Sequence, residues 1–156
     1  MRIGFIGLGT MGGAASLNLI RGGHQLTVCD LDLKRATKHL ELGAKWADTP
    51  SEAAKDVDIV FTMVFGPKQI EQIIRGENGL LHSMGPGQVW VDLTTNQPEL
   101  ARELAEEIID TGAIAIDAPV TGAVDGARNG NMTQFAGGDK ETIERIRSVM
   151  ELMGPV

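Results

Sequence analysis

Short apolar runs recur along the whole chain and are separated by more polar segments. Each main run is four to seven residues long and nearly free of charge, which is typical of strands covered on both faces of a parallel sheet. The run at 58–64, DIVFTMV, shows the pattern well. We expect strands at 3–6, 26–29, 45–47, 58–64, 88–92, 113–117 and 132–136.

Between these runs the apolar residues return at helical spacing. Leu100, Leu104 and Ile108 form one stripe, and glutamates fill the opposite face. A second stripe follows Asp139, which is expected to cap a helix carrying Ile143, Ile146, Val149, Met150 and Met153. We expect helices at 14–20, 33–42, after 49–51, at 69–75, from 98 and from 139, and a loop at 118–130.

Strands that alternate with helices predict an α/β fold with a doubly wound, mostly parallel sheet. Ligands bind such sheets at the carboxyl ends of the strands. We therefore expect the functional residues directly after Ile6, Cys29, Met63, Asp92 and Asp117.

The first thirty residues contain a strand, a glycine turn, a helix and a strand followed by an acid. Gly7 permits the tight turn, Gly9 lets the backbone approach a pyrophosphate, and Gly12 lets the helix pack closely on the strand. The helix N-terminus adds unpaired N–H groups that favour phosphate. This pattern predicts a Rossmann-type dinucleotide site, and a turn without a ligand is the alternative. The residues of the turn are Gly7, Leu8, Gly9, Thr10, Met11 and Gly12.

Asp30 ends the second strand of this unit, 18 residues after Gly12. Its carboxylate can accept hydrogen bonds from the ribose hydroxyls and would repel a 2′-phosphate, so we expect NAD in preference to NADP. Lys34 and Arg35 could weaken this preference, or they are only the solvated start of a helix.

Composition narrows the class of protein. The length of 156 residues predicts one domain, 1–156, and the net charge of −7 argues against nucleic acid as a partner. One cysteine and three scattered histidines predict no disulfide framework, no metal site and a cytoplasmic location. The uncharged stretch 3–20 resembles a membrane segment, but its five glycines favour a phosphate turn, so we expect no membrane contact.

Two later strand ends carry candidate polar groups. Thr94 and Thr95 follow the strand at 88–92, where they either face the cofactor or cap the helix at Pro98. Thr121 and Gly122 offer a hydroxyl and a bare backbone that suit a small carboxylate, or they form only a turn into a helix.

Four motifs in order, GFIGLGTMG, DLTTNQP, DAPVTGAVDGA and FAGG, make the chain resemble the 3-hydroxyisobutyrate dehydrogenase family. That family includes tartronate semialdehyde reductases and has 6-phosphogluconate dehydrogenase as a distant relative. The resemblance implies cofactor contacts from the glycine turn, Asp30, Val64, Phe65 and Thr95. It implies a small hydroxy-acid substrate whose carboxylate is held by Thr121, Gly122 and Ala123.

The chain departs from the family pattern at several points. The family usually has Ser at Thr121, Gly at Ala123 and Leu-Pro at Val64-Phe65, so we expect a tighter pocket. The resemblance places the catalytic lysine after Val156, followed by an all-helical domain, so no residue of this chain inherits the catalytic role. Lys68 and Lys140 do not match the lysine motif.

These observations predict the NAD-binding domain of an oxidoreductase that transfers a hydride between a nicotinamide cofactor and a small 3-hydroxy acid or its semialdehyde. A non-catalytic NAD(P)-binding module is the alternative, and a structural interaction domain would require that no nucleotide binds. We further expect the final helix to expose Ile146, Val149, Met150 and Met153 and so to favour a homo-oligomer.

Overall fold

The computed structural model describes all residues from Met1 to Val156. Its strands are β1 (Arg2–Ile6), β2 (Gln25–Cys29), β3 (Lys45–Trp46), β4 (Ile59–Thr62), β5 (Val89–Asp92), β6 (Ile114–Asp117), β7 (Val120–Thr121), β8 (Thr133–Gln134) and β9 (Gly137–Gly138). Its α-helices are α1 (Thr10–Arg21), α2 (Thr37–Glu41), α3 (Pro50–Ala53), α4 (Pro67–Arg75), α5 (Pro98–Asp110), α6 (Ala123–Asn129) and α7 (Lys140–Met150). Two 3₁₀ segments are η1 (Leu33–Ala36) and η2 (Leu80–His82).

Seven strands form one sheet in the order β3-β2-β1-β4-β5-β6-β9. Every neighbouring pair is parallel except β6 with β9, which is antiparallel. The expected doubly wound, mostly parallel sheet is therefore confirmed. The register brings the ends of the central strands into one row, Cys29, Ile6, Thr62, Asp92 and Asp117.

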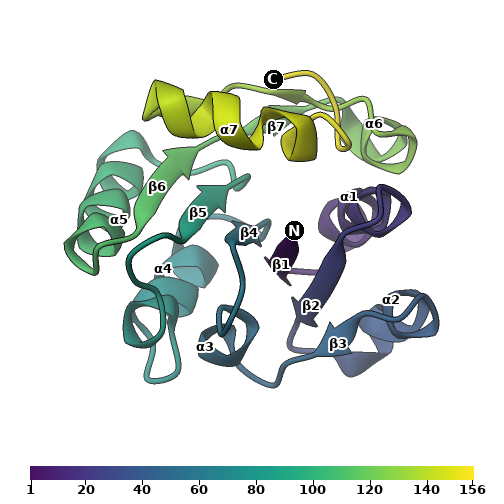
Figure 1. Cartoon of the computed structure of the whole chain (residues 1–156), viewed down its shortest axis with the longest axis horizontal. Coiled ribbons are helices and arrows are strands. Elements are labelled where there is room, and N and C mark those ends of the chain that lie inside the picture. The colour runs from purple at the N-terminus through teal and green to yellow at the C-terminus, as the bar shows by residue number, and fades with distance from the viewer.

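Helices cover both faces of this sheet (Figure 1). α1, α6 and α7 lie on one face, and α3, α4 and α5 lie on the other. Side chains alternate along each strand, so Phe61 packs beside Phe5 in the first layer while Val60 and Trp90 point into the second. Both layers are fully buried, which explains why the strands lack the polar alternation of a half-exposed sheet.

The segment 118–130, expected to be a loop, contains β7 and the seven-residue helix α6. The loop prediction was wrong because this helix draws its stability from a distant contact: it packs on α1, where Asn18 Nδ2 donates to the carbonyl of Ala127 at 2.8 Å. The last predicted strand is also different. Only Thr133 and Gln134 are extended there, and they pair with β7 in a separate two-stranded sheet.

The final helix does not expose its apolar stripe, contrary to the sequence-based prediction. Ile146, Val149, Met150 and Met153 are at most 3 % exposed. They join the core layer that contains Leu19 of α1. The helical spacing of these apolar residues indicated correctly that this face of the helix packs against another surface. That surface is formed by the sheet and α1 of the same chain. The argument for a homo-oligomer from this face therefore fails.

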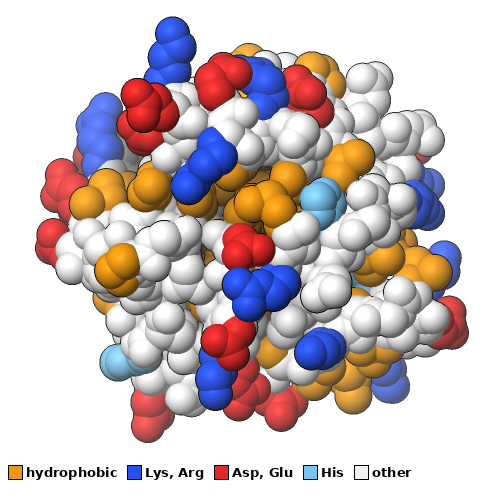
Figure 2. All heavy atoms as spheres, in the orientation of Figure 1, with side chains coloured by type: hydrophobic (Ala, Val, Ile, Leu, Met, Phe, Trp, Pro, Cys, Tyr) orange, Lys and Arg blue, Asp and Glu red, His pale blue; other side chains and the backbone are white.

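The remaining surface is mixed in character. Lysine, arginine and acidic side chains are interspersed over the face drawn in Figure 2, with smaller apolar areas between them. Large exposed apolar residues include Leu31 and Phe65. The longest helices fall short of what a membrane crossing requires in length and apolar character.

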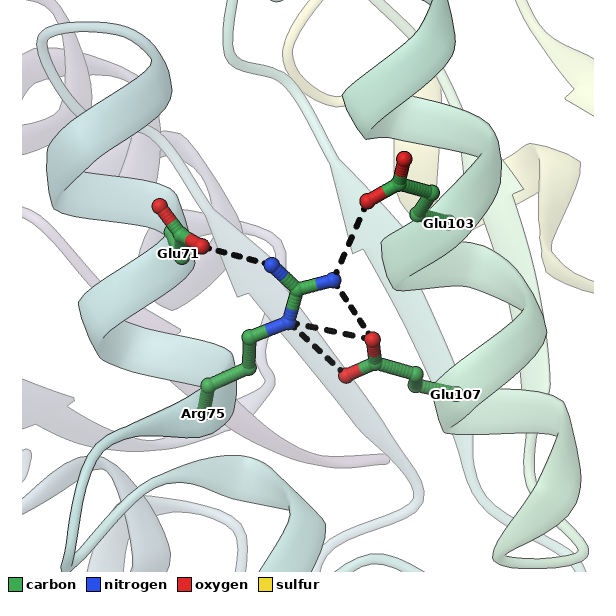
Figure 3. Close-up of polar contacts among 4 residues, drawn as sticks. All are labelled: Glu71, Arg75, Glu103 and Glu107. Carbon is green, nitrogen blue, oxygen red and sulfur yellow. Dashed lines mark hydrogen bonds and ion pairs between the residues drawn. The ribbon is translucent and has the colours of Figure 1, made fainter.

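One guanidinium joins α4 to α5 on the outer face of the second layer (Figure 3). Arg75 on α4 pairs with Glu71 one turn earlier and with Glu103 and Glu107 on α5. Its Nε donates to both oxygens of Glu107 at 3.0 Å. These bonds lower the pKa of Glu107 and raise that of Arg75. Without the cation, three carboxylates would face one another.

We predict that Arg75→Met lowers the midpoint of thermal unfolding by a few degrees, because it removes the only positive charge among three carboxylates. Arg102→Met is the matched control, since Arg102 lies exposed on α5 and forms no ion pair. The difference between the two variants should shrink in 1 M NaCl, where the screening length is about 3 Å. Equal melting temperatures in low salt would contradict the prediction.

Candidate functional site

The glycine turn lies at the carboxyl end of β1, where two glycines are fixed by close backbone contacts. Gly7 has φ +98°, and a Cβ there would lie 2.2 Å from the carbonyl oxygen of Met63. A Cβ on Gly12 would lie 2.1 Å from the carbonyl oxygen of Gly7. These are contacts that only a bare backbone permits. The turn and the start of α1 are therefore held against β1 and β4.

Gly9 differs from both neighbours because its missing side chain faces open space. The nearest atom to a Cβ there would be Nη1 of Arg35 at 3.9 Å. Gly9 is also the N-cap of α1 and provides no side-chain cap. The first backbone bond into the helix is donated by Gly13 to the carbonyl of Gly9 at 2.8 Å. The N–H groups of the first turn are thus free to bind an anion.

Asp30 is attached to the turn. Its Oδ2 accepts a hydrogen bond from Leu8 N–H at 2.7 Å, and its Oδ1 accepts one from Asp32 N–H at 3.0 Å. The side chain is only 8 % exposed. The carboxylate therefore has a fixed orientation beside the phosphate turn, and each oxygen keeps a second acceptor site for a ligand.

Basic side chains lie close to Asp30. Nη1 of Arg35 is 3.8 Å from Asp30 Oδ1, and the Arg35 side chain is 52 % exposed. An open cavity of about 480 Å³ begins at Gly9 and runs between α1 and α2; Lys34 and Lys38 also line it. Arg35 thus partly offsets the negative charge of Asp30 at the end of β2. The sequence alone did not decide whether Arg35 has this role or only belongs to the solvated start of a helix.

The loops after β4 and β5 are tied together. Val64 N–H donates to Oγ1 of Thr94 at 3.2 Å. Thr94 is buried, so the alternative that it caps α5 is wrong; the N-cap is Gln97, without a side-chain bond. Phe65 and Thr95, the neighbours of this pair, are exposed. Both side chains remain accessible to a ligand at the strand ends.

Thr121, Gly122 and Ala123 lie exposed where β7 passes into α6. Gly122 has φ +124°, and Ala123 has φ +51°, a left-handed conformation that a side chain disfavours. The same segment is held to α1 through Asn18 and Ala127. Backbone strain of this kind is often found at ligand sites.

Asp92 is a buried carboxylate that the sequence analysis did not identify as a candidate. It is 2 % exposed, and its Oδ1 accepts hydrogen bonds from Thr62 Oγ1 at 2.8 Å and Thr94 N–H at 3.1 Å. Its Oδ2 is buried without a partner. Burial is the main cause that raises its pKa to about 6, and Asp117 in the next strand adds to the effect. The sequence did contain a signal for this residue, namely an acid at the end of an otherwise apolar strand.

The lysines nearest these strand ends are Lys34 on η1 and Lys68 in the first turn of α4. No three His, Cys, Asp or Glu side chains converge. Lys68 is exposed on α4, and Lys140 lines a separate cavity with Arg147. Cys29 is buried, and burial is the main cause that raises its pKa to about 12, so its thiol is not a nucleophile at neutral pH.

We predict that Asp92→Asn gains stability relative to the unchanged chain as the pH rises from 4 to 7. The pKa of Asp92 is about 6 in the folded chain and 3.8 in the unfolded chain, so the folded chain binds this proton more tightly. The unchanged chain therefore loses folding stability as the pH rises through about 6. The difference between these two pKa values corresponds to roughly 2–3 kcal/mol of folding free energy. Denaturant unfolding of both proteins at several pH values measures it. A difference that does not change with pH would contradict the prediction.

Comparison with known proteins adds to this geometry. Residues 2–156 match the family described as the NAD binding domain of 6-phosphogluconate dehydrogenase. The 3-hydroxyisobutyrate dehydrogenase of Pseudomonas aeruginosa is 37 % identical over 152 residues, which are 97 % of this chain and 51 % of that protein. The chain thus spans about half the length of the curated relatives that it matches.

Solved structures show the same fold. The Mycobacterium tuberculosis 3-hydroxyisobutyrate dehydrogenase with L-serine superposes with a TM-score of 0.90 at 31 % identity, over 98 % of this chain and 52 % of that one. An imine reductase from Myxococcus stipitatus in complex with NADP⁺ gives 0.89 at 25 % identity, covering 99 % and 53 %. Its V8 variant in complex with NAD⁺ gives 0.88 at 26 % identity, covering 99 % and 52 %. This chain therefore belongs to the family described as the NAD binding domain of 6-phosphogluconate dehydrogenase.

Proposed function

We propose that residues 1–156 are the cofactor-binding part of an NAD-dependent dehydrogenase that acts on a small 3-hydroxy acid or its semialdehyde. The observation that carries this proposal is the uncapped turn at Gly9, open to an anion and flanked by the fixed carboxylate of Asp30. The names of the relatives, 3-hydroxyisobutyrate dehydrogenases, support the substrate class. We propose that 1–156 folds as one domain and acts in the cytoplasm.

The residues of the turn fit a pyrophosphate. First-turn N–H groups of α1 and the helix dipole would hold the phosphates, and the missing side chain of Gly9 leaves room for their approach. Asp30 would accept hydrogen bonds from the adenosine ribose. When bound, the nicotinamide supplies the hydride chemistry. The chain's own residues would bind the cofactor and orient it.

The nicotinamide end would lie over the strand ends that follow β4 and β5. Val64, Phe65 and Thr95 are our proposed contacts there, and Thr94 fixes the two loops relative to each other. We propose that Thr121, Gly122 and Ala123 hold the substrate carboxylate beside them. The strained Ala123 and the exposed Thr121 hydroxyl are the features that support this role.

The balance of charge at Asp30 supports NAD as the preferred cofactor. A 2′-phosphate would meet the fixed carboxylate, which is 8 % exposed, while the opposing Arg35 is 52 % exposed and more strongly screened by water. An imine reductase in complex with NADP⁺ and its V8 variant in complex with NAD⁺ share this fold, so the fold itself does not decide the preference between the two cofactors. The preference would depend on these two side chains.

We predict that Gly9→Ala weakens NADH binding and leaves the fold intact. Apart from its two chain neighbours, a methyl group there would meet no atom closer than Nη1 of Arg35 at 3.9 Å, yet it would occupy the approach to the pyrophosphate. Gly12→Ala is the matched comparison and should lower stability, because its methyl group would overlap the Gly7 carbonyl. Calorimetric titration and thermal melting separate the effects. Normal NADH affinity in a poorly stable Gly9→Ala would show that Gly9 is structural.

We predict that the unchanged chain binds NADH more tightly than NADPH and that Asp30→Asn narrows the gap by roughly 1–2 kcal/mol, the size of one charge interaction at intermediate dielectric. Asparagine can still accept the hydrogen bond from Leu8 N–H, so the turn should persist. Both cofactors are titrated against both proteins by calorimetry. Equal affinities in the unchanged chain would overturn the assignment of Asp30.

We predict that residues 1–156 alone bind NADH but do not turn over 3-hydroxyisobutyrate or glycerate. Lys68, in the first turn of α4 near Phe65, does not match the family's lysine motif, so we propose no acid/base group within this chain; general acid/base help is typically worth ~10²–10⁴ in rate. The assay follows NADH absorbance, with the Pseudomonas aeruginosa enzyme as positive control. Turnover comparable to that control would place the acid/base group within this chain. Such a result would contradict the proposal that residues 1–156 bind the cofactor without supplying the acid/base group.

A further inference from the structure

The polar groups at the ends of β4 and β5 form one connected network around Asp92. Trp90 Nε1 donates to Thr62 Oγ1 at 3.0 Å, and the Thr62 hydroxyl donates to Asp92 Oδ1 at 2.8 Å. The same oxygen accepts Thr94 N–H at 3.1 Å, and Thr94 Oγ1 accepts Val64 N–H at 3.2 Å. One buried carboxylate thus joins two strand ends to the two loops that leave them.

We propose that Asp92 is a positioning residue for the nicotinamide half of the cofactor site. It fixes Thr94, and through Thr94 it fixes Val64, so that the exposed neighbours Phe65 and Thr95 are presented in one arrangement. This inference rests on the proposed function, because Phe65 and Thr95 are there proposed as cofactor contacts. It adds a residue that touches no ligand.

The environment of Asp92 argues for a role beyond packing. It takes part in none of the chain's ion pairs, and its partner in the β5–β6 register is another acid, Asp117, whose charge adds to the rise of its pKa. Its Oδ2 has no hydrogen-bond partner although the atom is buried. A carboxylate in such surroundings costs folding free energy. It does supply an acceptor for two donors from different segments, which an apolar side chain cannot.

The adenosine half of the site is anchored separately. Asp30 holds the glycine turn through Leu8, on the far side of β1 from Asp92 in the strand order. Removing the Asp92 acceptor leaves that contact unchanged. The two halves of the dinucleotide can therefore be tested independently, using ADP-ribose as a ligand that lacks the nicotinamide.

The experiment measures dissociation constants of NADH and ADP-ribose for the full chain by calorimetry. Asp92→Ala should weaken NADH binding about tenfold, because two buried donors lose their acceptor, and should change ADP-ribose binding less than twofold. Asp92→Asn keeps an acceptor oxygen and should restore the NADH value to within about twofold. Loss of fold alone would weaken both ligands together.

A second pair of variants keeps the test valid if Asp92→Ala does not fold. Thr94→Val removes the acceptor for Val64 N–H with little change of shape, and it should reproduce the selective loss of NADH affinity. Thr94→Ser retains the hydroxyl and should behave as the unchanged chain does. Selective loss in Thr94→Val with rescue in Thr94→Ser supports the proposal.

The outcomes separate this inference from the proposed function. If the unchanged chain binds neither ligand, the proposed function fails and the inference fails with it. If it binds both ligands equally, or if the variants weaken both ligands in the same proportion, the dinucleotide site stands and the positioning role of Asp92 is wrong. NADH-selective loss in Asp92→Ala or Thr94→Val supports the role.

Discussion

The site depends on a contact that only glycine allows. At Gly7 the backbone passes so close to the Met63 carbonyl that a Cβ would lie 2.2 Å from it, and at Gly12 a Cβ would lie 2.1 Å from the Gly7 carbonyl. These two approaches let α1 begin directly at the end of β1 and beside β4. The N-terminus of α1 is thereby placed at the carboxyl edge of the sheet, where the ends of five strands meet in register.

Charge at this edge is arranged in two distinct ways. Asp30 accepts one N–H hydrogen bond on each carboxylate oxygen and has a cationic neighbour, Arg35. Asp92 has its hydrogen bonds on one oxygen only, and its register partner on the neighbouring strand β6 is another acid, Asp117. The first arrangement suits recognition of a neutral hydroxyl group by a fixed acceptor. The second arrangement costs folding stability and, in our proposal, fixes two loops relative to each other. Carboxyl groups with perturbed pKa values of this kind are common at functional sites.

Local sequence patterns predicted most of the framework. Apolar runs identified the central strands, and the glycine turn with its acid identified the edge where ligands would bind. Features that depend on distant contacts were not predictable. α6 is stabilised through Asn18, more than a hundred residues earlier, and β9 is a pair of glycines that pairs with β6. The apolar stripe of α7 was visible in the sequence, but its burial against the sheet was not.

The candidate site divides in the same way. The turn residues and Asp30 lie together as expected, because they belong to one local strand–helix–strand unit. The assignment of Thr94 required the structure, since sequence could not separate a helix cap from a link to Val64. Asp92 was overlooked because its role arises from Thr62, thirty residues earlier along the chain.

The central claim is that a dinucleotide binds across the glycine turn with its pyrophosphate at the start of α1. Titration of the ¹⁵N-labelled chain with NADH, followed by two-dimensional NMR, tests it most directly. We expect the largest shifts at the amides of Gly9, Thr10 and Met11, with further shifts at Leu31 beside Asp30 and at Phe65 and Thr95. No shifts at the turn, or shifts confined to the face formed by α4 and α5, would contradict it.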